Sequence, residues 1–490
     1  MRFLIPFLLL AELAAFSHAA ATRPPNIVYI LADDLGWTDL HCQGSEYYET
    51  PNIDRLASQG LRMQRFYNSQ NCTPTRAALM SGQYAPRTGV YTVQSLDRGP
   101  LLERRMNVPK NSTRLGLDRF ILPQVLKTAG YATAIFGKWG LGNDGEYHPG
   151  ARGFDDAMVA STRGSFLRLP SVPQPSEQYL MDFLTDRAVD FIDRHQDRPF
   201  FLYLPYFAVH TPITPKPEYE AAWKKKAPKG THWDPAYAAM IQSLDESVGR
   251  VMARLEALKL ADNTVLIFSS DNGGLGGYQR TEPPSKIKGF TDNAPLRGGK
   301  GTLYEGGLRV PFIIRWPGVV PPAATSEAMA VHVDIYPTFL EIAGATPKPH
   351  YPLDGVSFLS VLRNPAAPYH RPPIMWHFPG YLPSYVHRGT GLRTGPVGAI
   401  HSGDFKLMEF FESGKVELYN LRDDIGERHN LAAQLPDKVK ELEARLAAWR
   451  TSVHAEMPVM KTKQELKDDR AKAASQPKET KTARGEDRDQ

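Results

Sequence analysis

Carboxylate and amide side chains stand directly after two apolar segments of this 490-residue chain. Asp33 and Asp34 end the first of these segments, and Asp271 and Asn272 end a later one. Adjacent carboxylates repel each other, so a buried pair stays charged only beside a compensating cation. Oxygen ligands suit hard cations such as Ca²⁺ or Mg²⁺. A solvated turn would explain either pair alone, but their joint position after predicted core strands favours a metal site.

Basic side chains stand at equivalent places in the sequence. Lys138 ends a second apolar segment, and His210 follows a third. In open α/β sheets, functional sites form outside the carboxyl ends of the strands. We therefore expect Lys138 and His210 to converge with the acidic group, with a solvated lysine and a structural histidine as the simpler alternatives.

The segment N71-C-T-P-T-R-A-A-L-M-S-G82 contains one of only two cysteines in the chain. Pro74 suits the first turn of a helix, which places Cys72 near the helix N-terminus. The free amide groups and the helix dipole there favour an anion. Arg76, one turn further on, offers permanently charged donors to a group held at residue 72. Pairing of Cys72 with Cys42 in a disulfide is the alternative.

Apolar, β-rich segments alternate with helix patterns along most of the chain. This alternation predicts an α/β domain over residues 22–365, with a large, mostly parallel central sheet flanked by helices. The expected strands are 26–32, 131–136, 200–207, 264–269 and 310–315, and the expected helices are 50–60, 122–129, 179–195 and 236–259. The glycine-rich segment 273–277 lacks the ending of a phosphate-binding loop, so we interpret it as a flexible loop of the site.

The character of the sequence changes after about residue 365. Strand-like segments 398–412 and 415–421 are joined by a short polar turn and predict an antiparallel pair, and a helix is expected over 436–452. We therefore predict a small C-terminal α+β subdomain over residues 366–460. Residues 461–490 are almost entirely charged or polar without an apolar period, which predicts a disordered tail.

The N-terminus has the features of an export signal. Residues 1–20 contain an arginine, a short apolar run and small residues near Ala19, so we expect a cleaved signal peptide and a secreted or periplasmic protein. No other segment predicts a membrane span. The formal net charge of +5 is mild, and no basic stripe with interleaved aromatic residues is present, so we do not expect nucleic-acid binding.

The pattern Cys72-x-Pro74-x-Arg76 resembles the signature of the sulfatase family. The resemblance extends across nearly all of the chain, through the segments 26–37, 50–57, 136–142, 209–213, 270–273 and 297–312. It implies an alkaline-phosphatase-like fold and hydrolysis of sulfate monoesters. It also implies that a maturation enzyme oxidises Cys72 to formylglycine, whose hydrate supplies the nucleophilic oxygen. A thiol would instead leave a stable adduct after attack on sulfur.

The resemblance also implies roles for individual positions. The family's metal ligands match Asp33, Asp34, Asp271 and Asn272, joined by the oxygen on residue 72 after oxidation of Cys72. The metal is typically Ca²⁺, with Mg²⁺ less expected. The residues that bind the sulfate and assist departure of the alcohol match Lys138, His210 and Lys300.

One position departs from the family pattern. Much of the family has Lys-x-His where this chain has Lys138-Trp139-Gly140, and glycine transfers no proton. His148 is the nearest candidate to replace the missing histidine. Water together with the oxygen beside the metal is the alternative.

The expected substrate is a sulfated carbohydrate, because export and an aromatic-rich C-terminal segment favour one. Trp376, Phe378 and Tyr381 could stack on a sugar face. His377 could bond a sugar hydroxyl, although packing between the two domains explains this segment equally well. The nearest alternative function is a phosphomonoester, phosphodiester or phosphonate hydrolase of the same superfamily. A non-catalytic binder of sulfated glycans is the second alternative, motivated by Gly140.

Overall fold

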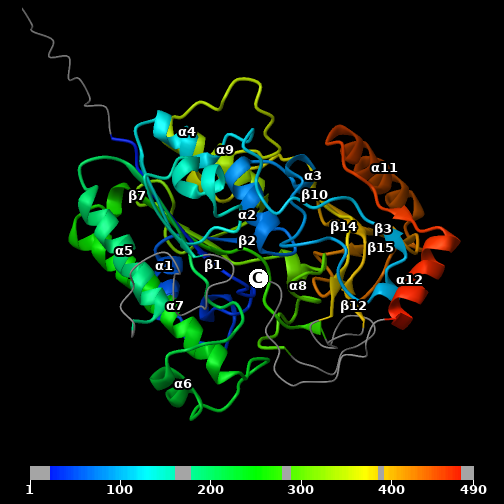
Figure 1. Cartoon of the computed structure of the whole chain (residues 1–490). Helices are drawn as coiled ribbons and strands as arrows, with labels where there is room; N and C mark the ends of the chain where they lie inside the picture. Colours follow the sequence, from blue (N-terminus) through cyan, green and yellow to red (C-terminus); the bar gives the residue numbers. More distant parts are fainter. Residues whose placement is uncertain (1–22, 161–177, 279–288, 385–390, 476–490) are drawn as a thin grey trace, which may run out of the picture.

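The computed structural model describes residues 23–160, 178–278, 289–384 and 391–475, and its largest element is an eight-stranded sheet (Figure 1). The strand order in this sheet is β5-β4-β6-β1-β7-β8-β2-β9. Its strands are β1 (Asn26–Ala32), β2 (Leu61–Tyr67), β4 (Ala132–Lys138), β5 (Asp156–Ala160), β6 (Phe200–Pro205), β7 (Thr264–Ser270), β8 (Phe312–Arg315) and β9 (Ala324–Val331). The order confirms the predicted large central sheet.

The pairing directions bring the ends of the central strands to one edge. β1 lies between β6 and β7 and is parallel to both, and β4 is parallel to β6 and β5. β8 alone runs against its neighbours β7 and β2. Since β1, β4, β6 and β7 point the same way, the residues that follow them share one edge of the sheet.

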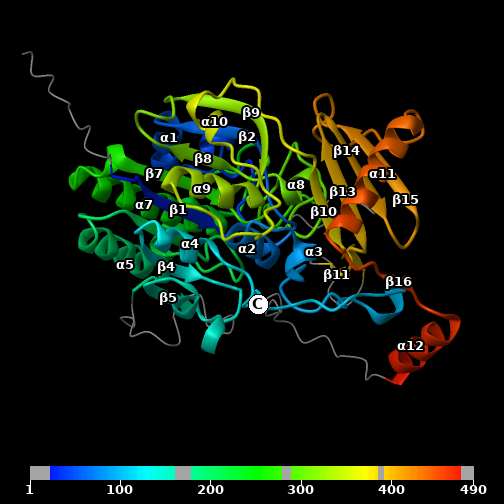
Figure 2. The same ribbon diagram turned by 90° about the horizontal axis from the view of Figure 1, so that it is seen from above.

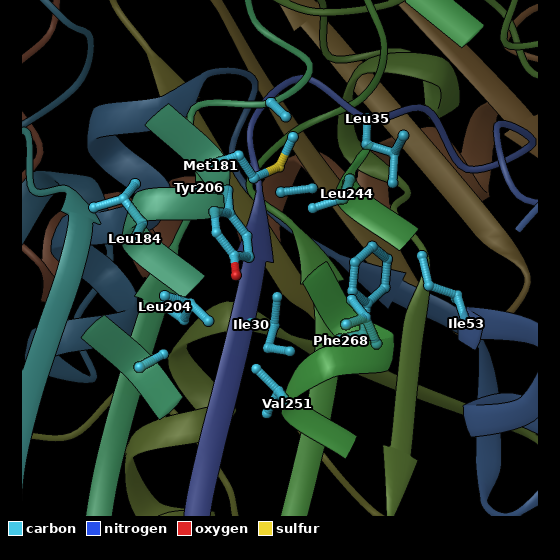
Figure 3. Close-up of a cluster of buried hydrophobic side chains, with 14 of the residues drawn as sticks. Ile30, Leu35, Ile53, Met181, Leu184, Leu204, Tyr206, Leu244, Val251 and Phe268 are labelled. Carbon is cyan, nitrogen blue, oxygen red and sulfur yellow. The ribbon is translucent and has the colours of Figure 1, made fainter. Parts of the chain in front are cut away.

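One face of the sheet is covered by α1 (Pro51–Ser58), α5 (Leu180–Arg194) and α7 (Pro235–Ala257). Alternate β1 side chains, such as Ile30, pack against them, because successive strand residues point to opposite faces. Figure 3 shows Ile30 with Leu204 and Phe268 from the neighbouring strands, in one cluster with Leu244 and Val251 of α7. These contacts bury the centre of the sheet beneath the helices.

The opposite face is covered by α2 (Cys72–Ser81), α4 (Leu122–Thr128), α9 (Ile335–Ala343) and α10 (Leu359–Arg363). The alternate β1 side chains, such as Tyr29, pack on this side. Every residue of α2 is buried, which is unusual for a helix and requires its polar side chains to find partners. The result is a three-layer sandwich with α2 close to the edge where the central strands end.

A second sheet lies beside the first and is built from the C-terminal part of the chain (Figure 2). It is antiparallel with the order β10-β13-β14-β15, where β10 is Ile374–Phe378, β13 Val397–Ser402, β14 Phe405–Phe410 and β15 Lys415–Asn420. Helix α11 (Pro436–Ser452) packs on it through Leu442 and Leu446. Short α8 (Glu305–Leu308) lies between the two sheets in both views (Figures 1 and 2).

Several smaller elements complete the described chain. The short strands are β3 (Met106–Asn107), β11 (Leu382–Pro383), β12 (Leu392–Thr394) and β16 (Val459–Met460). The remaining helices are α3 (Ala85–Thr88), α6 (Pro217–Trp223) and α12 (Lys463–Ser475). In the part of the chain that the structure describes, no helix has the length and apolar character needed to cross a bilayer. The expected signal peptide over residues 1–20 lies outside the described residues.

The sequence-based elements agree with the structure except in a few places. Strands β2, β5, β9 and β10 were not expected, and the segment 398–412 forms two strands joined at Gly403 instead of one. The segment 273–277 is buried, and a Cβ atom on Gly273 would lie 1.7 Å from the Gly306 carbonyl oxygen. This segment is therefore tightly packed against the neighbouring chain, contrary to the expectation of a flexible loop.

The expectation of disorder after residue 460 is wrong for residues 463–475, which form α12. The Thr462 hydroxyl accepts a hydrogen bond from the backbone N–H of Glu465, whose carboxylate accepts one from the backbone N–H of Thr462. This reciprocal capping box starts the helix, and Lys461 forms an ion pair with Asp469 at 2.8 Å. Composition alone hid a local capping signal. Residues 476–490 lie outside the described part.

Three buried histidines predict acid sensitivity of the fold. His332, His377 and His401 each have an Nδ1 atom without a hydrogen-bond partner among the residues that the structure describes. Burial lowers the pKa of His332 and His401 from 6.5 to about 3 and that of His377 to about 4. Below pH 6.5 the unfolded chain therefore binds protons that the folded chain does not, so stability is complete above pH 6.5 and falls on acidification, by up to about 1.4 kcal/mol per pH unit for each histidine.

We expect His377→Gln to reduce the loss of unfolding free energy between about pH 7 and pH 5 by roughly 2 kcal/mol relative to the parent protein. Urea unfolding at the two pH values measures this difference. His429→Gln is the matched control, because the His429 side chain is 81% exposed. An equal pH dependence of stability in the parent and His377→Gln would contradict the lowered pKa of His377.

Candidate active site

The acidic residues predicted to form a metal site meet at the carboxyl ends of β1 and β7. The backbone N–H of Asp34 donates to Asp271 Oδ1 at 3.2 Å, and Asn272 Nδ2 donates to Asp34 Oδ1 at 2.8 Å. The loop after β6 joins them, because the Asp33 N–H donates to the Ala208 carbonyl oxygen. All four side chains are buried, so the sequence-based convergence is observed in the fold.

Cys72 lies at the first residue of α2, directly beside the carboxylates. Its Sγ atom is 3.3 Å from Asp33 Oδ1 and 3.8 Å from Asp34 Oδ1. Atoms of Asp33, Asp34, Cys72 and His210 lie within 4.8 Å of one another. Cys72 is a free cysteine, as is Cys42, which excludes the disulfide alternative in this structure. The helix N-terminus therefore presents residue 72 to the acidic cluster.

Arg76 contacts the cluster in a different way from that expected. Its Nε and Nη2 atoms donate to Asp271 Oδ2 at 3.0 and 2.6 Å, and its Nη1 atom donates to the Lys138 carbonyl oxygen at 2.9 Å. Arg76 thus joins α2 to the ends of β7 and β4. A fork of fixed donors on one carboxylate orients Asp271 toward residue 72.

Two lysines form ion pairs with carboxylates of the cluster. Lys138 Nζ lies 2.6 Å from Asp33 Oδ2, and Lys300 Nζ lies 2.8 Å from Asp34 Oδ2. Lys300 Nζ is also 2.9 Å from His210 Nε2. Because His210 Nδ1 faces the Thr211 carbonyl oxygen, which can only accept, the Nε2 atom of a neutral ring is the acceptor from Lys300.

Burial and the neighbouring charges decide which groups of the cluster are ionised and which are neutral. Burial alone would raise the pKa of Asp33, but Lys138 and the other nearby cations hold it well below its usual range. Burial and the neighbouring Asp33 carboxylate raise the pKa of Asp271. Burial and the Lys300 ammonium lower the pKa of His210. Asp33 is therefore ionised and His210 neutral at ordinary pH.

The Cys72 thiol is held in its neutral form. Burial raises its pKa well above the usual value, and the carboxylates of Asp271 and Asp33 raise it further. A thiolate is the reactive form of cysteine, so this surrounding suppresses nucleophilic attack by sulfur.

The oxygen-rich side of the cluster fits a hard divalent cation. Among the described residues, Asn272 Oδ1 is buried without a hydrogen-bond partner, while the Asn272 Nδ2 contact with Asp34 fixes the amide orientation. An unpaired buried carbonyl oxygen costs free energy unless a ligand satisfies it. Carboxylate and amide oxygens from Asp33, Asp34, Asp271 and Asn272 form a donor set typical of Ca²⁺ or Mg²⁺.

Comparison with known proteins decides the family. A family model described as Sulfatase matches residues 25–345, and a model described as N-sulphoglucosamine sulphohydrolase, C-terminal, matches residues 299–452. The chain belongs to the sulfatase family. As a sulfatase it is an enzyme that hydrolyses sulfate esters, and it contains the C-terminal subdomain that the second model describes.

Similar proteins cover 70% or more of the sulfatase chain. A protein named sulfatase from Formosa agariphila is 37% identical over 90% of this chain and 92% of its own length. Human N-acetylgalactosamine-6-sulfatase is 32% identical over 70% of this chain and 67% of its own length. Among solved structures, Ps i-CgsB in complex with k-i-k-neocarrahexaose is 28% identical, with a TM-score of 0.72, over 92% of this chain and 98% of that one.

Gly140 lies beside the N-terminal turn of α2, where the missing histidine was considered. Its φ angle is +73°, and a Cβ atom there would lie 3.8 Å from Arg76 Cδ and 3.9 Å from Thr73 Oγ1. The described contacts of His148 are elsewhere, since its Nδ1 accepts the N–H of Gly150 at 3.1 Å and caps its own turn. The geometry gives no support to His148 as a replacement for the missing histidine.

We therefore expect His148→Ala to retain kcat/KM for an aryl sulfate within about two-fold, since only a turn contact is removed. Steady-state kinetics across the pH range test this expectation, with Lys138→Ala as the positive control for loss of activity. A large fall in kcat for His148→Ala, with an unchanged unfolding temperature, would restore His148 as a participant in turnover.

The aromatic segment 375–382 packs inside the protein, so the expectation that it binds a sugar is wrong. Trp376 is 4% exposed and its Nε1 donates to the Asn68 carbonyl oxygen, while Phe378 and Tyr381 are fully buried. His377 is also 4% exposed, with Nε2 bonded to the Glu456 carbonyl oxygen. Trp376 packs against Tyr67 of β2 and so joins the two sheets, which agrees with the packing alternative, and the buried His377 is bonded to the backbone.

Sequence reasoning missed polar groups that support the site. Tyr237 of α7 donates to the backbone oxygen of Asp34 at 3.2 Å and to Asp39 Oδ2 at 2.6 Å. Ser270 Oγ accepts the Leu35 N–H and donates to the Asn272 carbonyl oxygen. Their partners are distant in sequence, and a tyrosine in a helix pattern looks like an ordinary core residue.

Proposed function

We propose that this sulfatase hydrolyses a sulfate monoester of a carbohydrate, using a formylglycine made from Cys72 and a bound Ca²⁺ ion. The observation that carries the proposal is the position of Cys72. Its side chain sits at the buried N-terminus of α2, 3.3 Å from Asp33 Oδ1 and within the same small cluster as His210. A maturation enzyme that acts on the unfolded chain is required, because the folded protein encloses the thiol.

Oxidation of Cys72 explains why a neutral thiol is placed at a polar centre. As a formylglycine hydrate, residue 72 would supply the oxygen that displaces the alcohol from sulfur. Its second hydroxyl would allow sulfate to leave by returning residue 72 to the aldehyde, and water would then restore the hydrate. The N–H groups at the start of α2 and the helix dipole favour the negative charge that develops on the oxygen of residue 72.

Other residues of the chain bind the sulfate and move protons. Lys138 and Lys300 place two ammonium groups on the rim of the cluster, which suits the negative oxygens of a sulfate group. His210 and Lys300 share a contact at 2.9 Å. Lys300 Nζ can therefore deliver a proton to the leaving alcohol oxygen directly, or by way of His210 Nε2, which accepts from it.

The oxygen cluster would hold the proposed Ca²⁺. Asp33, Asp34, Asp271 and Asn272 would supply the ligands, and the ion would neutralise charge on the transferring group as a Lewis acid. Arg76 keeps Asp271 oriented, and Asn272 presents its unpaired Oδ1. These contacts prepare the ligand geometry before the ion binds.

The names of two similar proteins support a carbohydrate substrate. One is N-acetylgalactosamine-6-sulfatase, and the other was solved in complex with k-i-k-neocarrahexaose. We also propose that the sulfatase is exported, because residues 1–20 resemble a signal peptide. A sulfated polysaccharide outside the cell is a substrate that an exported enzyme can reach.

Competition between ester classes tests the function. Protein purified from an expression host that forms formylglycine is assayed with aryl sulfate, aryl phosphate and a panel of sulfated saccharides. We expect the highest kcat/KM for sulfate esters and sulfate release from at least one saccharide. Preference for the phosphate would favour the phosphoester alternative, and saccharide binding without turnover would favour a non-catalytic glycan binder.

A further inference from the structure

The segment that carries Lys300 is held by two parts of the protein. On the side of the large sheet, the Lys300 N–H donates to the Gly274 carbonyl oxygen at 3.1 Å, and the Gly301 N–H donates to the Gln70 carbonyl oxygen at 2.6 Å. The segment then continues into α8, which begins at Glu305 and faces the C-terminal sheet. The position of Lys300 therefore depends on contacts with the part of the chain around the large sheet and with the C-terminal sheet.

A buried cluster of charged side chains holds the start of α8 against the C-terminal subdomain. Lys406 of β14 has its Nζ atom 3.0 Å from Glu305 Oε1 and 2.9 Å from Glu427 Oε1. Glu427 Oε2 accepts the backbone N–H of Glu305 at 2.7 Å, at the first turn of α8. None of these three side chains has exposed surface, and two of them come from the C-terminal subdomain.

Further contacts from the C-terminal subdomain flank the same segment. Arg297 Nη1 donates to the Tyr419 hydroxyl and to the Glu427 carbonyl oxygen, each at 3.0 Å. Thr394 Oγ1 of β12 donates to the Gly301 carbonyl oxygen. The C-terminal subdomain thus contacts the chain before Lys300, directly after it and at the start of α8.

The energetics of the cluster favour a positioning role over a stabilising one. Burial of ions costs several kcal/mol each, and an apolar replacement of the whole group is often no less stable. Although burial would raise the pKa of Glu305, Lys406 lowers it. The carboxylates of Glu427 and Glu305 raise the pKa of Lys406 against the effect of burial, and burial raises the pKa of Glu427. Two ionised, fully enclosed partners permit one geometry, because displacement of either leaves a buried charge unpaired.

We infer that Lys406, Glu305 and Glu427 are positioning residues through which the C-terminal subdomain sets the place of Lys300 in the active site. This inference rests on the proposed role of Lys300 in binding the sulfate. A shift of about 1 Å at such a group costs on the order of 10²-fold in rate. The second sheet therefore contributes to catalysis without touching the reacting atoms.

A double-mutant cycle tests the inference. We expect Glu427→Gln and Lys406→Met each to lower kcat/KM for an aryl sulfate by roughly 10- to 100-fold. We expect the same substitutions to change kcat/KM less than about two-fold when Lys300 is already alanine, because coupled residues are not additive. Titration of inorganic sulfate by calorimetry is the second readout, with weaker binding expected in each single variant.

Arg450→Met is the matched control. Arg450 of α11 forms an ion pair with Glu409 of the same strand β14 at 2.8 Å, so its loss perturbs the same subdomain away from Lys300. We expect Arg450→Met to keep kcat/KM, and any small effect to persist in the Lys300→Ala background.

Three results would overturn the inference. Losses from Glu427→Gln that are equal in the parent and Lys300→Ala backgrounds would show that the charge cluster only stabilises the fold. Full activity of Glu427→Gln beside an impaired Lys300→Ala would overturn it while leaving the proposed function intact. Full activity of Lys300→Ala itself would remove the role of Lys300 and the inference together.

Discussion

We expect Cys72→Ala to abolish sulfate ester hydrolysis, with kcat/KM lower by on the order of 10⁴-fold or more, because alanine supplies no nucleophilic oxygen. The substitution removes one atom from a buried helix start and leaves the carboxylates and lysines in place. Its unfolding temperature should therefore stay close to that of the parent protein. Steady-state kinetics with an aryl sulfate, beside thermal unfolding, measure both effects.

Cys42→Ala is the matched control for Cys72→Ala. Cys42 is also a free cysteine and is only partly buried, and its contacts lie near α1, away from the acidic cluster. We expect Cys42→Ala to retain activity. Equal loss in both variants would contradict a special role for residue 72, as would substantial turnover by Cys72→Ala.

We expect Asp33→Asn to weaken Ca²⁺ binding by at least about 10- to 100-fold and to lower kcat/KM by on the order of 10² to 10³. The substitution keeps the size of the side chain but removes the negative charge that faces Lys138 at 2.6 Å. Calorimetric titration of Ca²⁺ into chelator-treated protein measures the affinity, and kinetics at saturating Ca²⁺ measure the remaining rate.

The control for Asp33→Asn is Asp155→Asn, which removes a carboxylate paired with Lys127 outside the cluster. It should leave Ca²⁺ affinity and activity unchanged. Chelator treatment of the parent protein should lower activity, and added Ca²⁺ should restore it. Full activity of exhaustively chelated protein would contradict the proposed metal site, whatever the behaviour of Asp33→Asn.

The parts of the site that could be predicted from the sequence are those set by single strands. Asp33 and Asp271 directly follow β1 and β7, and parallel strands must end at one edge. Cys72 could be placed at a helix start because Pro74 fixes the first turn locally. Each of these predictions required only the neighbouring residues and the general topology of α/β sheets.

Contacts between distant segments could not be predicted. Arg76 bonds Asp271, although the sequence suggested a donor to residue 72, because β7 ends beside α2 in the folded chain. Strand β2 could not be predicted because Arg62 and Arg65 interrupt its apolar pattern. The structure explains both arginines: Arg62 bonds the Cys42 carbonyl oxygen, and Arg65 lies against the C-terminal sheet.

Burial of the C-terminal aromatic residues could not be predicted from the sequence either. A tryptophan or tyrosine between polar residues is compatible with a sugar-binding surface or with an interface inside the protein. The Tyr381 hydroxyl accepts the N–H groups of Arg105 and Met106 and donates to Glu412. These partners come from two separate segments, so only the fold shows that Tyr381 joins them.

Mass spectrometry of the peptide that contains residue 72, taken from protein with measured sulfatase activity, tests the central claim most directly. We expect an aldehyde at residue 72. Across preparations with different degrees of maturation, kcat should rise in proportion to the fraction of protein that carries the aldehyde. Fully active protein with an unmodified thiol at Cys72 would contradict it.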